Sequence, residues 1–512
     1  MLSWGLAITG LLLGRTRPHV GLAVLVGVVI VTPSLDWQFG LPNLSTAFVY
    51  MFWLLIGTWW YRTVHKSSGS PVGPPDNPLN PHMTLAIQLS ILTVAVSCLL
   101  ALLRNVPLGE LHFQLRPAFA NLSTFYPQGE AGPLQAAMIA IMGLLLLALF
   151  VEQLDTPAKR SMLTTAFTVG IVIAVSSRLL QSAFGLDPNV RPDKRVETGE
   201  GMVGFFQDQH SFAAFLVLAI GVSAGLTYSN FNTGRRGAAS AYAGLTLMGS
   251  LILLYTNSRG GLLALAGAIL ISTFTWLALS LRVAATSEQG KRKLVVSSVL
   301  TVVLLGILVG MVVSPSLRGS VQHTLGGLGN PRMWEFLDPE TAENPLLARR
   351  VLLWRKGANL VGERPIWGFG PRGYSSRGVA VRPELLDAYG DIHGVSELAS
   401  AREELEVENA HSYFLQYAAE FGMPALISLL ALVGLAMATI LRGAYRSPDT
   451  FDRGLLWGIA FGQGAFLILS LVSHPLLLAE LQGAFWTLSA LGIATVIHRG
   501  NDQAIGASGA NQ

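Results

Sequence analysis

Residues 82–103 read HMTLAIQLSILTVAVSCLLALL, a run that holds no Asp, Glu, Lys or Arg. As a helix rising 1.5 Å per residue, it is long enough to cross the ~30 Å hydrocarbon layer of a bilayer. Similar runs recur along the chain, of which 51% is hydrophobic and only 12% charged, against roughly 25% charged residues in soluble domains. In lipid, each backbone polar group must be hydrogen-bonded within the protein, which favours helices. The sequence therefore predicts an all-α, polytopic integral membrane protein.

The hydropathy pattern predicts about 12 transmembrane helices. The expected spans are residues 2–13, 20–34, 45–61, 82–103, 133–152, 162–184, 210–228, 237–256, 261–281, 294–314, 412–441, 454–473 and 475–498. The first is too short to cross untilted, which leaves open the side of the N-terminus and the exact number of spans. We expect an N-terminal bundle (1–314), a long, partly helical loop (315–411), C-terminal spans (412–498) and a disordered tail (499–512).

The orientation follows from Lys and Arg in the short connections, because cytoplasmic loops are enriched in these residues. One alternate set of connections carries at least two each: Arg15 and Arg17; Arg62 and Lys66; Lys159 and Arg160; Arg235 and Arg236; Arg282, Lys291, Arg292 and Lys293; and Arg442, Arg446 and Arg453. This set is predicted to be cytoplasmic. The long loop 315–411 is then extracytoplasmic.

The long loop has helix signals of its own. Asn344 followed by Pro345 predicts a helix start, and apolar residues then recur at helical spacing until Gly362. Ser400 with Glu403 forms a capping box that predicts a second helix, starting at Ser400 and running toward residue 411. Between the two, residues 365–374 read PIWGFGPRGY, whose glycines are typical of a tight turn.

His411 is the first candidate for chemistry. An imidazole with a pKa near 6.5 can take a proton from a hydroxyl group at neutral pH. On a continuous helix, Glu404 and Glu408 would share its face and orient the ring. The alternative is a histidine at the membrane interface with no catalytic role.

Several arginines near the outer ends of spans are candidates for anion binding. Arg259 lies in the turn Tyr-Thr-Asn-Ser-Arg-Gly-Gly between two spans, and its guanidinium group suits phosphate oxygens. The alternative is an arginine that only extends toward the headgroups. His210 at the start of one span and Arg178 near the end of another are weaker candidates for substrate binding.

Arg350 and Arg355 flank Trp354 on the first loop helix. A cationic face beside an aromatic ring suits a phosphate with an attached sugar, although a solvated helix face has the same pattern. Metal and nucleotide motifs are absent: the chain has no His-x-x-x-His, no Asp-x-Asp and no Gly-x-x-x-x-Gly-Lys, and Cys98 is its only cysteine. We expect neither a metal nor a cofactor.

Taken together, these features resemble the bacterial O-antigen ligase and polymerase superfamily, over about residues 200 to 490. Four stretches carry the resemblance: GFFQDQHSFA at 204–213; NSRGGL at 257–262; Arg350 with Trp354, Pro365, Gly368, Gly370, Gly373 and Tyr374; and AHSYFLQ at 410–416 with Glu420, Gly422 and Leu426. Members of this superfamily usually have Asn after the histidine, where this chain has Ser412.

The resemblance implies a multi-pass glycosyltransferase of the bacterial inner membrane with its active site facing the periplasm or exterior. It implies a donor glycan on polyprenyl diphosphate, and lipid A core or another glycan as acceptor, with no nucleic acid involved. Arg259 and Arg350 would bind the diphosphate, and His411 would be the base of an inverting transfer. Two alternatives stay open: a polymerase that extends lipid-linked repeats, and a lipid or solute transporter without catalysis. The oligomeric state is also open.

Overall fold

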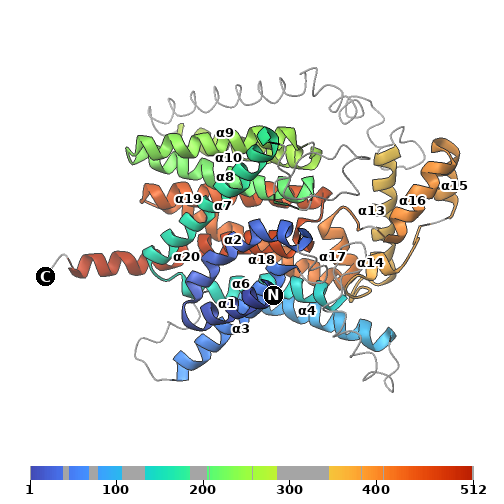
Figure 1. Ribbon diagram of the computed structural model, residues 1–512, viewed down its shortest axis with the longest axis horizontal. Helices are drawn as coiled ribbons and strands as arrows, with labels where there is room; N and C mark the ends of the chain where they lie inside the picture. The colour runs from blue at the N-terminus through green and yellow to red at the C-terminus, as the bar shows by residue number, and fades with distance from the viewer. Residues whose placement is uncertain are drawn as a thin grey trace.

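The computed structural model describes residues 2–38, 45–67, 79–105, 133–184, 205–206, 208–256, 258–284, 345–381, 383–407 and 409–509 (Figure 1). Within these ranges every regular element is helical. Eight of the described helices are long and apolar enough to cross a membrane. The prediction of an all-α polytopic membrane protein is confirmed.

The eight spanning helices are α4 (Pro81–Asn105), α6 (Pro133–Gln153), α7 (Pro157–Phe184), α8 (Gln209–Asn232), α9 (Arg236–Tyr255), α18 (Met423–Arg446), α19 (Thr450–Val472) and α20 (Ala479–Gly509). The helices α1 (Leu2–Thr16), α2 (Pro18–Gln38), α3 (Thr46–Ser67) and α10 (Arg259–Ala284) pack around them. The expected span 294–314 lies outside the described residues. α20 continues to Gly509, where the sequence predicted a disordered tail, and no proline after residue 498 interrupts the helix.

Glycines let α8 and α19 pack backbone to backbone. A Cβ added at Gly225 would lie 2.3 Å from the carbonyl oxygen of Gly454, and one added at Gly458 would lie 2.5 Å from that of Gly221. Small residues at such contacts are typical of helix pairs in membranes, where close van der Waals packing drives association. The two helices therefore form a tight antiparallel pair in the centre of the bundle.

The N-terminal segment is a helix attached to α3, whereas the sequence left its path open. Gly14 of α1 and Gly57 of α3 face each other's backbones: a Cβ added at Gly14 would lie 2.4 Å from the carbonyl oxygen of Leu54, and one at Gly57 would lie 2.4 Å from that of Leu11. This contact holds α1 along α3.

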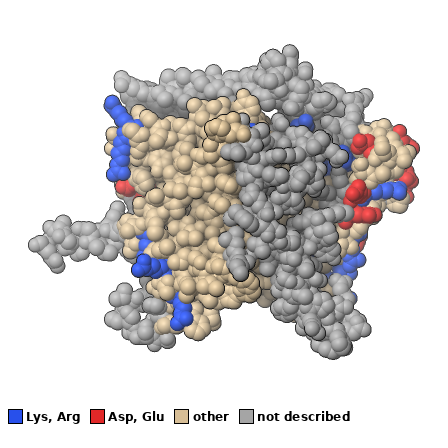
Figure 2. Space-filling model, viewed as in Figure 1, with Lys and Arg blue, Asp and Glu red and all other residues tan. Residues whose placement is uncertain are grey.

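The two ends of the bundle differ in charge. At one end, Arg62 of α3 pairs with Glu152 of α6 at 2.8 Å, and Arg453 donates to the carbonyl of Ser447. Figure 2 shows Lys and Arg side chains gathered at this end, on the left, and a mixture of acidic and basic side chains over α13–α16 on the right. The pocket described below lies at the second end, between the first residues of α3, α6 and α20.

The loop before residue 409 folds into α13 (Pro345–Glu363), α14 (Gly373–Ser376), α15 (Pro383–His393) and α16 (Val395–Val407). Lys356 of α13 is fully buried and joins them: its ammonium group donates to the carbonyl of Leu405 and lies 4.5 Å from the centre of the Tyr374 ring. Burial lowers the pKa of Lys356 to about 8. This single side chain therefore links α13, α14 and α16.

Two expectations about this region are wrong. The second loop helix starts at Val395 rather than Ser400. Gly394, the residue directly before Val395, has φ +92° and turns the chain there. The span expected at 412–441 is two helices, α17 (Tyr413–Phe421) and α18, separated by Gly422 with φ +89°. The short helix α17 brings polar side chains to the end of the bundle.

Candidate active site

The glycine-rich turn at 365–370 packs against the end of α17 and is hydrogen-bonded to it. The N–H groups of Phe369 and Gly370 donate to the carbonyls of Ala419 (3.0 Å) and Glu420 (2.7 Å). Gly368 has φ +59°, and a Cβ there would lie 2.3 Å from the oxygen of Glu420. The predicted tight turn therefore exists because the backbones of the loop and α17 are in direct contact.

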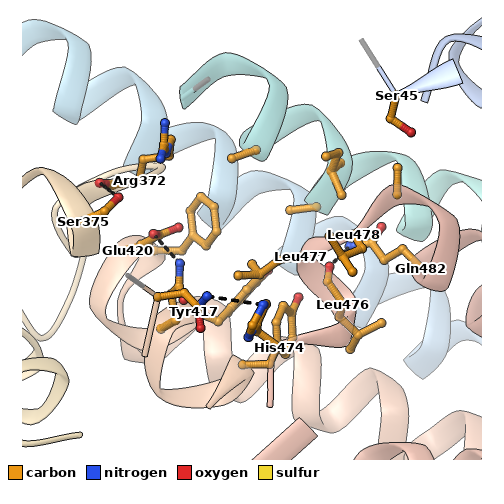
Figure 3. Close-up of a pocket in the computed structure, with 18 of the residues that line it drawn as sticks. Ser45, Arg372, Ser375, Tyr417, Glu420, His474, Leu476, Leu477, Leu478 and Gln482 are labelled. Atoms are coloured by element: carbon orange, nitrogen blue, oxygen red, sulfur yellow. Dashed lines mark hydrogen bonds between the residues drawn. The ribbon is translucent and has the colours of Figure 1, made fainter. Parts of the chain in front are cut away.

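A pocket of about 150 Å³ opens beside α17 (Figure 3). Its walls come from the starts of α3, α6 and α20, from α14 and from α17. Figure 3 shows Arg372, Ser375 and Glu420 at one end, Ser45 and Gln482 at the other, and His474 between them. Its volume is below the roughly 300–1,000 Å³ of drug-sized sites. It suits a single small polar group, such as one sugar unit.

Glu420 is one of two buried acids that line this pocket, the other being Glu480, and 2% of the Glu420 surface is exposed. It accepts a hydrogen bond from Gln416 Nε2 at 3.0 Å and further bonds from the backbone N–H groups of Arg372 and Tyr374. Burial outweighs these contacts and raises the pKa of Glu420 to about 7. Gln416 also accepts from the N–H of Ala410 at 3.2 Å, so the acid is connected to the residue before His411.

His411 is half-buried and has φ +44°, a left-handed conformation that is uncommon outside glycine. Its N–H donates to Oδ1 of Asn409 at 2.9 Å, and its ring centre lies 5.6 Å from that of His474 in an edge-to-face arrangement. Because α16 ends at Val407, His411 is not on a continuous helix. The expectation that Glu404 shares a helical face with it is therefore wrong, and Glu408 lies outside the described residues.

The turn that contains Arg259 packs against the end of α19, near His474. Gly260, which follows Arg259 at the exposed start of α10, packs on Leu469 and Val472 of α19. His210 joins this group through its Nδ1 atom, 3.4 Å from Ser258 Oγ. The chain leaving α19 then meets α17, since Tyr413 N–H donates to the carbonyl of Ser473 at 2.9 Å.

The other predicted residues lie on neighbouring helices. Arg350, Trp354 and Arg355 are half-buried on α13, which packs on α17 where Gly357 meets Leu415. Arg178 lies on α7, near the helix end at Phe184. None of the seven predicted site residues is among the described residues that line the pocket, and His411 adjoins it through His474.

Comparison with known families identifies this region. Residues 243–430 match the family model described as O-Antigen ligase. This part of the chain is similar to the O-antigen ligase family. The resemblance to the O-antigen ligase and polymerase superfamily is thereby confirmed, and no curated protein matches the chain as a close relative.

The O-antigen ligase match contains five of the seven candidates, Arg259, Arg350, Trp354, Arg355 and His411, together with Glu420. His474 lies beyond it and was missed in the sequence, as were the pocket roles of Glu420 and Asn409. One signal was available for His474: the short connection Ser473-His474-Pro475 falls on the same predicted side as His411. The pairing itself could not be inferred, because Asn409 and His474 are 65 residues apart.

Proposed function

We propose that this protein is a membrane glycosyltransferase that transfers a glycan from a polyprenyl-diphosphate-linked donor to an acceptor hydroxyl, at the outer face of the bacterial inner membrane. The observation that carries the proposal is the setting of His411: a histidine within the stretch that matches the O-antigen ligase family, held beside a pocket at one end of an apolar bundle. The outer face is favoured because basic residues gather at the opposite end.

In the proposed reaction, His411 is the general base. It takes the proton from the acceptor hydroxyl as that oxygen bonds to the anomeric carbon of the donor sugar. The bond from this carbon to the diphosphate oxygen breaks, and the diphosphate leaves with the electron pair. A positioned base of this kind typically contributes 10² to 10⁴ in rate. Attack opposite the leaving group inverts the anomeric centre.

The arginines have the complementary role. Arg259, exposed at the start of α10, and Arg350 on α13 bind the donor diphosphate and stabilise the charge that develops on it. In this scheme guanidinium groups supply the stabilisation and the step requires no metal. Arg355, Trp354, His210 and Arg178 are proposed to contact the rest of the substrate. The lipid tail of the donor lies in the membrane against the exposed leucines of the spanning helices.

The acceptor distinguishes two forms of this function. A ligase transfers the glycan to lipid A core, and a polymerase transfers it to a second lipid-linked repeat. We place the ligase first, because the family description that matches is O-Antigen ligase. A transporter is the alternative of another class, and it would release no polyprenyl diphosphate.

The test is release of polyprenyl diphosphate from a lipid-linked oligosaccharide by the purified protein in detergent, with and without lipid A core. Release that depends on the core supports a ligase, and release with lengthening of the glycan in its absence supports a polymerase. His411→Ala is the matched inactive variant. No release with either acceptor would contradict the proposed function and favour transport.

A further inference from the structure

Asn409 connects the two histidines of the site through the two ends of its amide group. Its Oδ1 atom accepts from the backbone N–H of His411 at 2.9 Å, and its Nδ2 atom lies 3.2 Å from Nε2 of His474. An amide oxygen only accepts hydrogen bonds and an amide nitrogen only donates them. Because a backbone N–H faces the oxygen, the orientation of the amide is fixed.

This orientation determines the protonation of His474. The Asn409 nitrogen donates, so Nε2 of His474 must offer a lone pair. A neutral imidazole carries one proton, which is then on Nδ1. If Nε2 of His474 carried a proton, it would face the Nδ2–H group of Asn409, and two donors would oppose each other. Rotating the Asn409 amide would not help, because Nδ2–H would then face the backbone N–H of His411. The contact is therefore compatible with one form of His474, the neutral Nδ1–H tautomer.

The backbone on both sides holds the histidines in place. Ser473 accepts from the N–H of Tyr413, and the carbonyl of His474 accepts from the N–H of Leu477 at 3.0 Å. The two rings meet at 72°. His474 thus presents a rigid, uncharged ring to His411 at the wall of the pocket.

We propose that His474 is a positioning residue for the transfer reaction, held by Asn409 as the neutral Nδ1–H tautomer so that it orients the ring of His411. The inference rests on the proposed function of His411 as the base. A neutral neighbour matters because His411 becomes positively charged when it takes the proton. A charged His474 at the same distance would oppose that step.

The first test reads the tautomer directly and does not depend on activity. The full-length protein is labelled with ¹⁵N-histidine, and the His474 signals are assigned by their loss in His474→Gln. We expect the chemical-shift pattern of a neutral ring protonated at Nδ1. In Asn409→Asp, a carboxylate oxygen replaces the donor, so the pattern should change to protonation at Nε2. A wild-type ring protonated at Nε2 would overturn the proposal, even if the protein proved to be a transporter.

The second test uses the transfer assay. His474→Leu should lower kcat about 10- to 100-fold with little change in KM, whereas His474→Gln, which keeps an acceptor for Asn409, should recover part of the loss. His82→Gln, at an exposed histidine on α4, is the control and should leave kcat unchanged. Wild-type kcat in a folded His474→Leu protein would rule out the positioning role. Absence of transfer activity in the wild-type protein would instead contradict the proposed function.

Discussion

Gly422 lies so close to Ile366 that a Cβ added to the glycine would be 2.0 Å from the carbonyl oxygen of the isoleucine. Gly422 also has φ +89° and ψ 167°, a combination found essentially only in glycine. The junction between α17 and α18 is therefore fixed by a backbone contact that no side chain can replace.

Gly422→Ala should destabilise the protein by more than the roughly 1–3 kcal/mol that such a backbone conformation costs alone, because the clash adds to it. Thermal unfolding in detergent measures the effect. The control is Gly434→Ala in α18, where an added Cβ meets nothing within 4 Å and the higher helix propensity of alanine should leave stability equal or slightly raised. Equal melting temperatures for the two variants would contradict the contact.

The contact between α8 and α19 should be equally sensitive to an added side chain at its glycines. Gly458→Val places a branched side chain against the backbone of Gly221 and Gly225, so we expect loss of folded protein on size-exclusion chromatography. Gly464→Val lies in the same helix with open space around its Cα and should yield protein like the wild type. Normal yield of the Gly458 variant would show that the two helices are less closely packed.

Glu420 should make stability depend on pH. Its pKa is raised from 4.5 to about 7, so its contribution is fully present below pH 4.5 and is lost as the pH rises to about 7. The loss is roughly 3 kcal/mol at most. Melting temperatures of the wild type should therefore fall between pH 5 and 8 more than those of Glu420→Gln. Parallel curves for the two proteins would rule out the raised pKa.

His411→Gln should lower the single-turnover rate by about 10² to 10⁴, the usual contribution of a general base. Substrate binding should change little, since the proposed role is in the chemical step. The measurement is rapid quench with a labelled lipid-linked donor at saturating concentration. An unchanged rate in folded protein would remove His411 from the mechanism.

Arg259→Lys should lower turnover about 10- to 100-fold, because lysine keeps the charge and loses the paired donors that match phosphate oxygens. The control is Arg235→Lys, at the opposite, basic end of the bundle, which should retain full activity. Steady-state release of polyprenyl diphosphate compares them. Full activity of the lysine variant would mean that Arg259 acts only as a point charge or not at all.

The sequence predicted the membrane class and the start of α13 at Pro345, because apolar runs and helix caps are local signals. It also predicted the tight turn after Pro365. It could not predict that Gly422 would split the span expected at 412–441, since the positive φ follows from contact with Ile366, far away in the chain.

For the candidate site, the residues named from the sequence stay predictions, and local signals decided which residues were named. His411 and Arg259 stood out as charged or ionisable residues beside apolar runs. The network of Asn409 and His474 depends on a fold that joins two distant connections. A buried acid such as Glu420 also resembles any polar residue of a helix until its surroundings are known.

The glycine contacts between α8 and α19 also fix the positions of the two helices relative to each other along their axes. α8 starts beside His210, and α19 ends beside Ser473 and His474. Helices whose backbones touch at successive glycines cannot slide past each other by one turn, about 5.4 Å, without a clash. The pair is therefore a rigid unit that tilts as one body where the bilayer is thinner than its apolar length. His210 at the start of α8 and His474 just after the end of α19 lie at the same end of this antiparallel pair, so the glycine contacts fix the spacing of these two residues along the helix axes.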